Sequence, residues 1–233
     1  MSHPSFVLEW ADGRVLLVDL GMNREGALAF GKVIERLSGG APLQPLTSVA
    51  ERFGEARRRV QGIVFTHLHT DHTGGLTDFC TGLSQSIPVF MTEAQAERPN
   101  FTTRPGLKLL NTAGCVRPQI LQKGPLLTLA GFPGVVVIAA GGHTPGSQII
   151  IANVQNGADV RTFALVGDIA NNIDGITYNI PKPTLYSLLV VPEDGDRLDE
   201  LRRFLRDLHD QQATTLLVSH DQRHIEQSAV PAF

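Results

Sequence analysis

The stretch Thr66-His67-Leu68-His69-Thr70-Asp71-His72 contains the pattern His-x-His-x-Asp-His. It follows the short apolar run Val60 to Phe65, which reads as a buried strand, and it precedes Gly74-Gly75. The chain has 8 histidines in 233 residues, so three within six positions depart strongly from a random distribution. Imidazoles and a carboxylate crowded together at the end of a strand predict a metal site.

The spacing within this stretch predicts two metal ions. Residues two apart on an extended segment project to the same side, so His67 and His69 can share one ion. Asp71 and His72 lie at the turn beyond and point elsewhere, so the loop can serve two ions about 3.5–4 Å apart. Each ion then has only two ligands from the loop, and the rest of the chain must supply the others.

Three further residues stand where such ligands are expected. His143 follows the apolar run 134–140, Asp168 follows 163–166, and His220 follows 214–218. Taken alone, each residue would more often be a cap or a buried polar group than a metal ligand. Together with the histidine loop, they are predicted to complete the two sites.

The order of elements predicts one α/β domain spanning residues 1–233. Strands are expected at 6–10, 14–20, 60–65, 89–92, 126–129, 134–140, 147–154, 161–166 and 214–218. Helices are expected at 24–38, 47–59, 75–84 and 198–208, whereas 98–118 is expected to be irregular. Two sheets inside and helices outside accommodate this order.

Composition narrows the function classes. The apolar fraction is 42%, the charged fraction 18% and the mean hydropathy +0.01, as in ordinary globular proteins. Apolar runs are far shorter than the roughly 20 residues that span a bilayer, and the first residues do not resemble a signal peptide. These features predict a cytoplasmic protein without membrane contact. A net charge of −3 gives no field that would favour nucleic acid.

The remaining histidines and the cysteines are expected to have no catalytic role. His3 is expected on a frayed end, His209 near a helix C-terminus and His224 on the surface. Cys80 and Cys115 are too few and too isolated to indicate a disulfide framework or a cysteine zinc site. Both are expected to be buried small apolar residues.

The seven candidate residues resemble the ligand motifs of the metallo-β-lactamase-fold metallohydrolase superfamily, in the same order along the chain. The resemblance implies an αββα four-layer sandwich with two mixed β-sheets flanked by helices. It also implies that Asp168 bridges two ions. Asp19, in Val18-Asp19-Leu20-Gly21, would contact one of the metal ligands without binding the metal itself. The implied ligand sets are His67, His69 and His143 for the first ion, and Asp71, His72 and His220 for the second.

The acidic residue at the bridging position resembles the lactonase and glyoxalase II branches, because β-lactamases of the family usually have cysteine or serine there. The lactonase branch typically has a tyrosine three residues after the bridging aspartate, where this chain has Asn171. Tyr178 and Tyr186 are candidate replacements, and Met22 is a candidate substrate contact by position alone. The stretches 99–111 and 173–192 are further candidates, also by position alone.

The function implied by this resemblance is hydrolysis of an ester-like bond in a lactone, ester or thioester by a metal-bridging hydroxide. Two divalent ions are expected, Zn²⁺ first, with iron or manganese as alternatives. Asp71 would orient the water and move a proton. The alternatives are phosphodiesterase, nuclease or β-lactamase activity on the same centre, and a mononuclear iron oxygenase of the persulfide dioxygenase type. The expected partner is a small-molecule substrate, and the oligomeric state stays open, with a homodimer as one option.

Overall fold

The computed structural model describes residues 3–38, 45–124, 126–183, 187, 190–211 and 214–231. These residues contain two five-stranded sheets. The first sheet has the spatial order β1 (Phe6–Glu9), β2 (Val15–Val18), β3 (Val60–Val64), β4 (Ile87–Met91) and β5 (Val116–Ile120). The second has the order β10 (Thr214–Val218), β9 (Asp159–Gly167), β8 (Gln148–Asn156), β7 (Val135–Ala139) and β6 (Leu127–Thr128).

Both sheets are mixed. The β1–β2 hairpin is antiparallel, whereas β2, β3, β4 and β5 run parallel. In the second sheet β6 to β9 are antiparallel neighbours, and β10 lies parallel to β9. The predicted turn around Asn156-Gly157 joins β8 to β9. Gly157 has a positive φ of 63° there, a conformation that glycine adopts readily.

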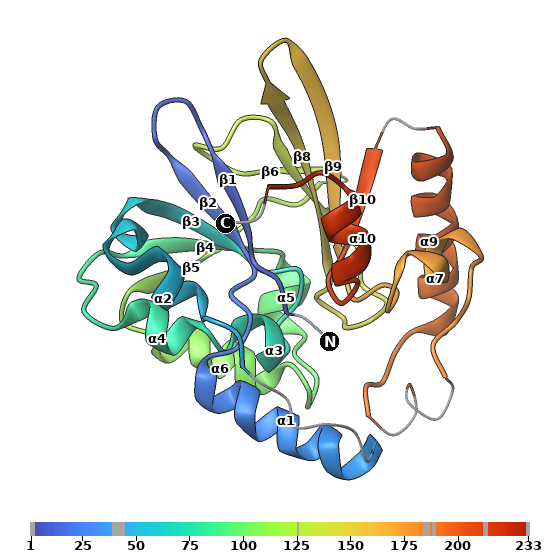
Figure 1. The fold of residues 1–233 in the computed structure, drawn as a ribbon, viewed down its shortest axis with the longest axis horizontal. Coiled ribbons are helices and arrows are strands. Elements are labelled where there is room, and N and C mark those ends of the chain that lie inside the picture. Colours follow the sequence, from blue (N-terminus) through green and yellow to red (C-terminus); the bar gives the residue numbers. More distant parts are fainter. Residues whose placement is uncertain are drawn as a thin grey trace.

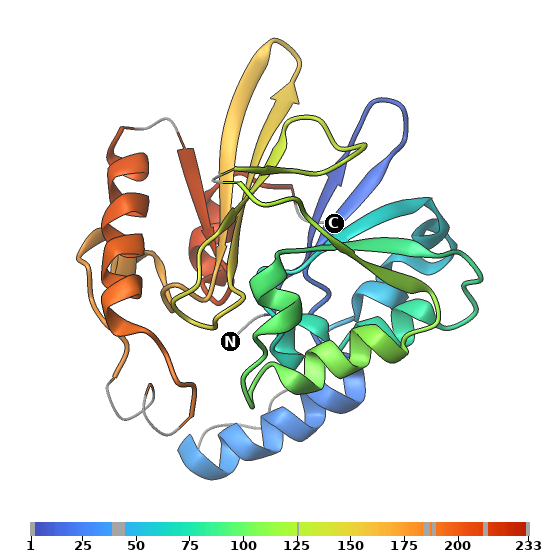
Figure 2. The same ribbon diagram turned by 180° about the vertical axis from the view of Figure 1, so that it is seen from behind.

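Helices cover the outer faces of both sheets (Figures 1 and 2). The helices after the first strands are α1 (Arg24–Ser38), α2 (Val49–Phe53), α3 (Thr70–Thr73), α4 (Leu76–Cys80), α5 (Glu93–Glu97) and α6 (Arg104–Thr112). A 3-10 helix, η1, covers Gly54–Arg59. The later helices are α7 (Ile173–Thr177), α9 (Gly195–Asp210) and α10 (Gln222–Gln227).

Alternating side chains separate three apolar cores. On β2, Leu16 and Val18 face the core between the sheets, whereas Val15 and Leu17 face the helices outside the first sheet. This alternation follows from the two-residue period of a strand. A third core packs the second sheet against α9 through Leu198, among others. Three cores require four layers, which confirms the predicted αββα sandwich.

One predicted loop is wrong. Within 98–118 the structure forms α6 and the beginning of β5. Proline is compatible with the first turn of a helix, where Pro105 lies, and with an edge strand, where Pro118 lies. Gly106 is required there, because a Cβ at this position would overlap the Leu68 carbonyl oxygen.

The prediction for the cysteines is also wrong. Cys80, at the end of α4, and Cys115, just before β5, form a disulfide with their Cα atoms 5.2 Å apart. They are 35 residues apart in the sequence, so their isolation there gave no indication of their proximity. Cys115 is buried, as expected, in the core between the first sheet and its helices.

Among the described residues, no helix combines the length and apolar character needed to cross a bilayer.

Candidate metal centre

The site lies at one edge where strands of both sheets end. β7 and β9 are both antiparallel to β8, so they run in the same direction, and β10 is parallel to β9. Their carboxyl ends therefore lie at one edge, where His143, Asp168 and His220 follow β7, β9 and β10. The buried amide of Gln148 joins this edge to the first sheet by donating to the Phe65 carbonyl at 2.7 Å. The histidine loop follows two residues later.

The structure brings all seven predicted side chains together in two groups. Within each group, one candidate ligand atom from every residue lies within 4.8 Å of the others. The first group is His67, His69 and His143, and the second is Asp71, His72, Asp168 and His220. The division of the histidine loop between two groups agrees with the spacing argument, and ligation by these residues stays a prediction.

The first group presents three ring nitrogens to one another. His69 Nδ1 lies 3.0 Å from His67 Nε2 and 3.3 Å from His143 Nε2. Burial lowers the pKa of His67 and of His143, and it lowers the pKa of His69 to about 4. The rings are therefore neutral at pH 7 and have lone pairs available. Three such lone pairs at one point suit a shared cation.

The second group contains buried polar atoms that make no hydrogen bond to other described residues. Asp168 Oδ2 lies 3.0 Å from His220 Nε2, and Asp168 Oδ1 lies 3.4 Å from His72 Nε2. Neither His72 Nε2 nor Asp168 Oδ1 has a hydrogen-bond partner among the described residues, although both atoms are buried. Buried polar atoms without partners are costly, so this chemistry fits a bound divalent ion.

Asp168 faces both groups. Its Oδ2 lies 3.7 Å from His143 Nε2 and 4.0 Å from His67 Nε2, in addition to the contact with His220. One carboxylate therefore lies between the two sets of candidate ligands. This is the position expected of a bridging ligand.

The charges of the site favour a cation. Burial alone would lower the pKa of His72, but the carboxylates of Asp19, Asp71 and Asp168 raise this pKa well above its usual value. Burial alone would raise the pKa of Asp168, but His220 and His72 hold it well below its usual range. Carboxylates that would stabilise a protonated imidazole also stabilise a metal ion.

Partners on the far side of the rings fix their orientation. Asp19 accepts hydrogen bonds from the Thr66 backbone N–H at 2.8 Å and the Thr66 hydroxyl at 2.7 Å, and its Oδ2 lies 2.8 Å from His72 Nδ1. Thr102 Oγ1 lies 2.8 Å from His69 Nε2. Such contacts select the tautomer and direct the other ring nitrogen into the site.

Two residues beside His143 were not predicted. Glu193 Oε1 lies 2.6 Å from His143 Nδ1, and Lys182 Nζ lies 2.7 Å from the same carboxylate oxygen. Lys182 and Glu193 lie on the segment between α7 and α9, at the same edge of the second sheet. No motif in the sequence marks them, because their proximity to His143 depends on how that segment returns to the sheet.

The predicted position of His3 on a frayed end is wrong. His3 Nδ1 lies 3.3 Å from Asp71 Oδ2, and the His3 ring packs edge-on against His220. The described part of the chain therefore begins beside the second ligand group. Gly21 permits this approach, because a Cβ at its position would lie 2.8 Å from the His3 carbonyl oxygen. His209 lies in the last turn of α9, as expected.

The remaining candidates lie around the centre or outside the described residues. Met22 lies against Gly74, directly after α3. Tyr178 follows α7 and is 70% exposed, and none of its described contacts reaches the seven candidate ligands. Tyr186 falls outside the described residues. Substrate contact by any of the three stays a prediction.

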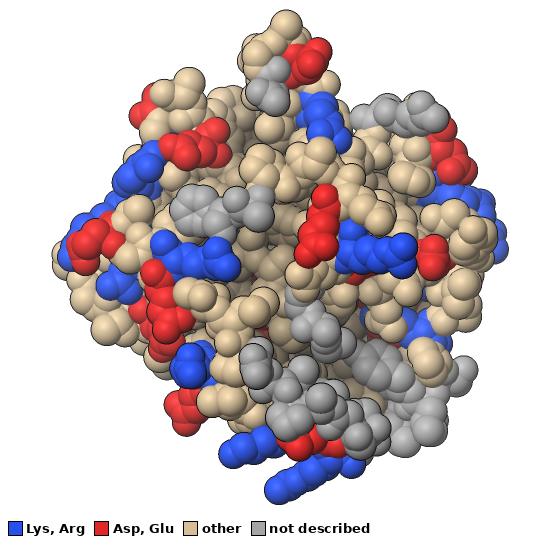
Figure 3. Space-filling view, in the orientation of Figure 1, with Lys and Arg blue, Asp and Glu red and all other residues tan. Residues whose placement is uncertain are grey.

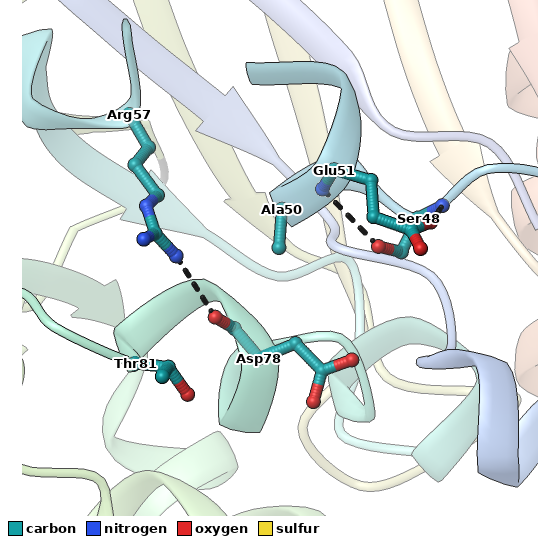
Figure 4. A pocket seen from close by; sticks show the side chains of 6 residues that line it. All are labelled: Ser48, Ala50, Glu51, Arg57, Asp78 and Thr81. Carbon is teal, nitrogen blue, oxygen red and sulfur yellow. Dashed lines mark hydrogen bonds between the residues drawn. The ribbon is translucent and has the colours of Figure 1, made fainter. Parts of the chain in front are cut away.

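A separate hollow of about 370 Å³ shares no residue with the seven candidate ligands (Figure 4). It is lined by Ser48, Ala50, Glu51, Arg57, Asp78 and Thr81. The Arg57 guanidinium donates to the carbonyls of Asp78 and Phe79 at 3.0 and 3.2 Å. Arg57 therefore ties η1 to α4, a structural role.

The fold and the grouped histidines and aspartates together define a class of protein. A model of the metallo-beta-lactamase superfamily matches residues 1–220, so the chain belongs to that superfamily. Its relatives include an N-acyl homoserine lactonase of Bacillus cereus, 23% identical over an alignment of 159 residues that covers 64% of this chain and 58% of the lactonase. A ribonuclease of Thermus thermophilus is 30% identical over 205 residues, covering 80% of this chain and 40% of the ribonuclease. The chain thus spans less than two thirds of either relative.

Solved structures show the same fold. An N-acyl homoserine lactone hydrolase, determined with its product N-hexanoyl-L-homoserine at the catalytic metal centre, superposes with a TM-score of 0.66. It covers 98% of this chain and 84% of its own, at 17% identity.

Proposed function

We propose that this protein is a metal-dependent hydrolase that cleaves an ester-like bond in a lactone, ester or thioester. The observation that carries the proposal is the pair of candidate ligand groups with Asp168 between them. Two ions bound by these adjacent groups would suit hydrolysis by an activated water. The likeness to lactonases in sequence and fold supports the ester-like substrate.

Two divalent ions are proposed as cofactors, with zinc first and iron or manganese as alternatives. Five imidazoles and two carboxylates without a thiolate suit all three metals. When bound, such ions lower the pKa of water and polarise a carbonyl or phosphoryl oxygen.

Asp71 is proposed as the residue that orients the attacking water and accepts its proton. Burial alone would raise the pKa of Asp71, but His72 and His3 hold it below its usual range, so the side chain is a carboxylate at pH 7. The Asp71 side chain is 18% exposed, more than the 8% of Asp168. It is therefore the more accessible acid for a water arriving with the substrate.

Phosphodiester hydrolysis is the second candidate, favoured by the similarity to the ribonuclease. Two metal ions serve that reaction equally well. The net charge of −3 and the mixture of acidic and basic side chains on the face shown in Figure 3 give no extended basic surface there for a nucleic acid. The ester-like substrate is therefore ranked first.

The purified protein should be tested for metal content and against five substrates: a homoserine lactone, a p-nitrophenyl ester, a thioester, a cephalosporin and a bis(p-nitrophenyl) phosphodiester. About two ions per chain and fastest turnover of one of the first three are expected. Turnover should be lost in Asp71→Ala, with His209→Ala as the control. Preference for the cephalosporin or the phosphodiester would overturn the ester-like assignment. One iron and no second ion would favour the oxygenase instead.

Two further properties are proposed. Residues 1–233 form a single domain, since one core packs both described sheets together. The cytoplasmic location stays a prediction, and the Cys80–Cys115 disulfide weighs against it, because disulfides are rare in the reducing cytosol of mesophiles.

A further inference from the structure

His143, the member of the first group that follows a strand of the second sheet, has a charged partner at its Nδ1 atom. Glu193 Oε1 lies 2.6 Å from His143 Nδ1. A carboxylate only accepts hydrogen bonds, so the ring proton lies on Nδ1 and the lone pair on Nε2. Nε2 is the atom that faces His69 and Asp168. The contact with Glu193 thus selects the tautomer that can ligate an ion.

Lys182 connects the pair formed by Glu193 and His143 to Asp168, the acid between the two ligand groups. Its buried Nζ donates to Glu193 Oε1 at 2.7 Å and to the backbone carbonyl of Asp168 at 2.6 Å. Lys182 Nζ also lies 3.1 Å from His143 Nδ1, but two donors do not form a hydrogen bond. One ammonium group therefore links the carboxylate partner of His143 to the backbone of Asp168.

Lys182 and Glu193 neutralise each other, and their polar atoms have hydrogen-bond partners. Ser187 Oγ donates to Glu193 Oε2 at 2.6 Å, so both carboxylate oxygens have partners. The side chains of Lys182 and Glu193 are 4% and 2% exposed. A buried charge is tolerated when it is paired and hydrogen-bonded, as both are here. Such an arrangement holds its geometry closely, because both charged side chains are buried and hydrogen-bonded.

From these contacts we infer that Glu193 and Lys182 are positioning residues of the metal centre. Glu193 fixes the tautomer and orientation of His143, and Lys182 holds the Asp168 backbone against the same carboxylate. The inference rests on the proposed function, in which His143 and Asp168 bind metal. Glu193 then acts on the first ion, whereas Lys182 acts on both, because Asp168 faces both groups.

The test measures metal binding. Apoprotein is prepared with a chelator and titrated with Zn²⁺ in competition with a chromophoric chelator. Glu193→Ala should weaken one of the two ions about 10–100-fold, the usual effect of losing such a partner. Lys182→Met should weaken both. Glu193→Gln, which keeps an acceptor for Nδ1, should weaken the same single ion less than Glu193→Ala. With Co²⁺ alone, the visible bands of Glu193→Ala should differ from those of the wild type.

Arg202→Met is the matched control. Arg202, on α9, is also a buried cation, and its Nε donates to Asn179 Oδ1 at 2.8 Å. The Arg202→Met substitution should lower the thermal stability of the apoprotein and leave both Zn²⁺ affinities unchanged. If Glu193→Ala does not fold, Glu193→Gln carries the test.

The inference is overturned by wild-type affinity for both ions in the Glu193 variants, or by equal losses in Arg202→Met. Wild-type affinity in Lys182→Met overturns the role of Lys182. Failure of the proposed function has different results: without a metal centre the wild-type protein itself would bind no Zn²⁺, and a wrong ester-like assignment would appear only in the substrate assay.

Discussion

His3 Nδ1 lies 3.3 Å from Asp71 Oδ2 at the more exposed side of the second ligand group. The His3 ring also packs edge-on against His220, with ring centroids 5.1 Å apart, and against Phe30 at 5.7 Å. A residue near the start of the chain therefore restricts the acid proposed to handle the proton. Its side chain is 15% exposed, so it lies close to solvent.

Replacing His3 with alanine should lower kcat about 10-fold, because Asp71 loses a partner that holds its carboxylate, and loss of such partners costs about 10–100-fold. The Zn²⁺ content should stay near that of the wild type, since His3 belongs to neither ligand group. Steady-state kinetics and metal analysis measure both effects. His209→Ala serves as the control and should behave as the wild type. Unchanged kcat in His3→Ala would refute this role.

Replacing Asp168 and His143 separately should distinguish a bridging ligand from a ligand of one ion. Asp168→Ala should lose both ions, because its carboxylate faces both groups. His143→Ala should lose one ion and all turnover. Metal analysis after gel filtration measures the stoichiometry. An Asp168→Ala protein that retains two ions would show that the groups bind independently.

Binding of metal should stabilise the fold. His72 Nε2 and Asp168 Oδ1 are buried without hydrogen-bond partners among the described residues, and an ion would satisfy both. A free ion concentration of 100 times Kd adds about 2.7 kcal/mol to the free energy of unfolding. For a chain of this size that raises Tm by about 5–10 °C. Scanning calorimetry of apoprotein with and without Zn²⁺ measures the shift, and identical Tm values would contradict metal binding to the folded state.

Removing the disulfide should reduce stability without affecting the metal centre. Cys80 and Cys115 are separated by 35 residues, and neither cysteine belongs to the two ligand groups. Closing a loop of that length stabilises a fold by about 2–4 kcal/mol. A Cys80→Ser/Cys115→Ser protein should therefore unfold at lower urea concentration, with unchanged Zn²⁺ content and kcat. Equal stability of the two proteins would contradict the prediction.

Local patterns explain why so much of the fold was predictable. The helix expected at 24–38 and the strand expected at 214–218 have the observed bounds. Each has an unambiguous spacing of apolar residues. The segment 98–118 was mispredicted because Pro105 and Pro118 suggest a loop, whereas their positions in a first turn and an edge strand allow regular structure.

The candidate ligands were also accessible to sequence reasoning, since each follows an apolar strand or belongs to one compact motif. The residues around them were not. Lys182, Glu193 and His3 have no motif and come from segments far from the histidine loop in sequence. The same holds for the pairing of Cys80 with Cys115, because two cysteines 35 residues apart give no sign of their distance in space.

The sequence by itself determined all described strands except β5, the mixed α/β order and the seven side chains proposed to bind metal. These depend on local apolar periodicity, on a motif within six residues, and on three polar residues that each follow an apolar strand. Only the tertiary structure decided which atoms face one another: Asp168 between two groups, Glu193 and Lys182 behind His143, and His3 beside Asp71. These contacts arise from the return of distant segments to one edge of the two sheets, and such long-range packing leaves no periodic trace in the sequence.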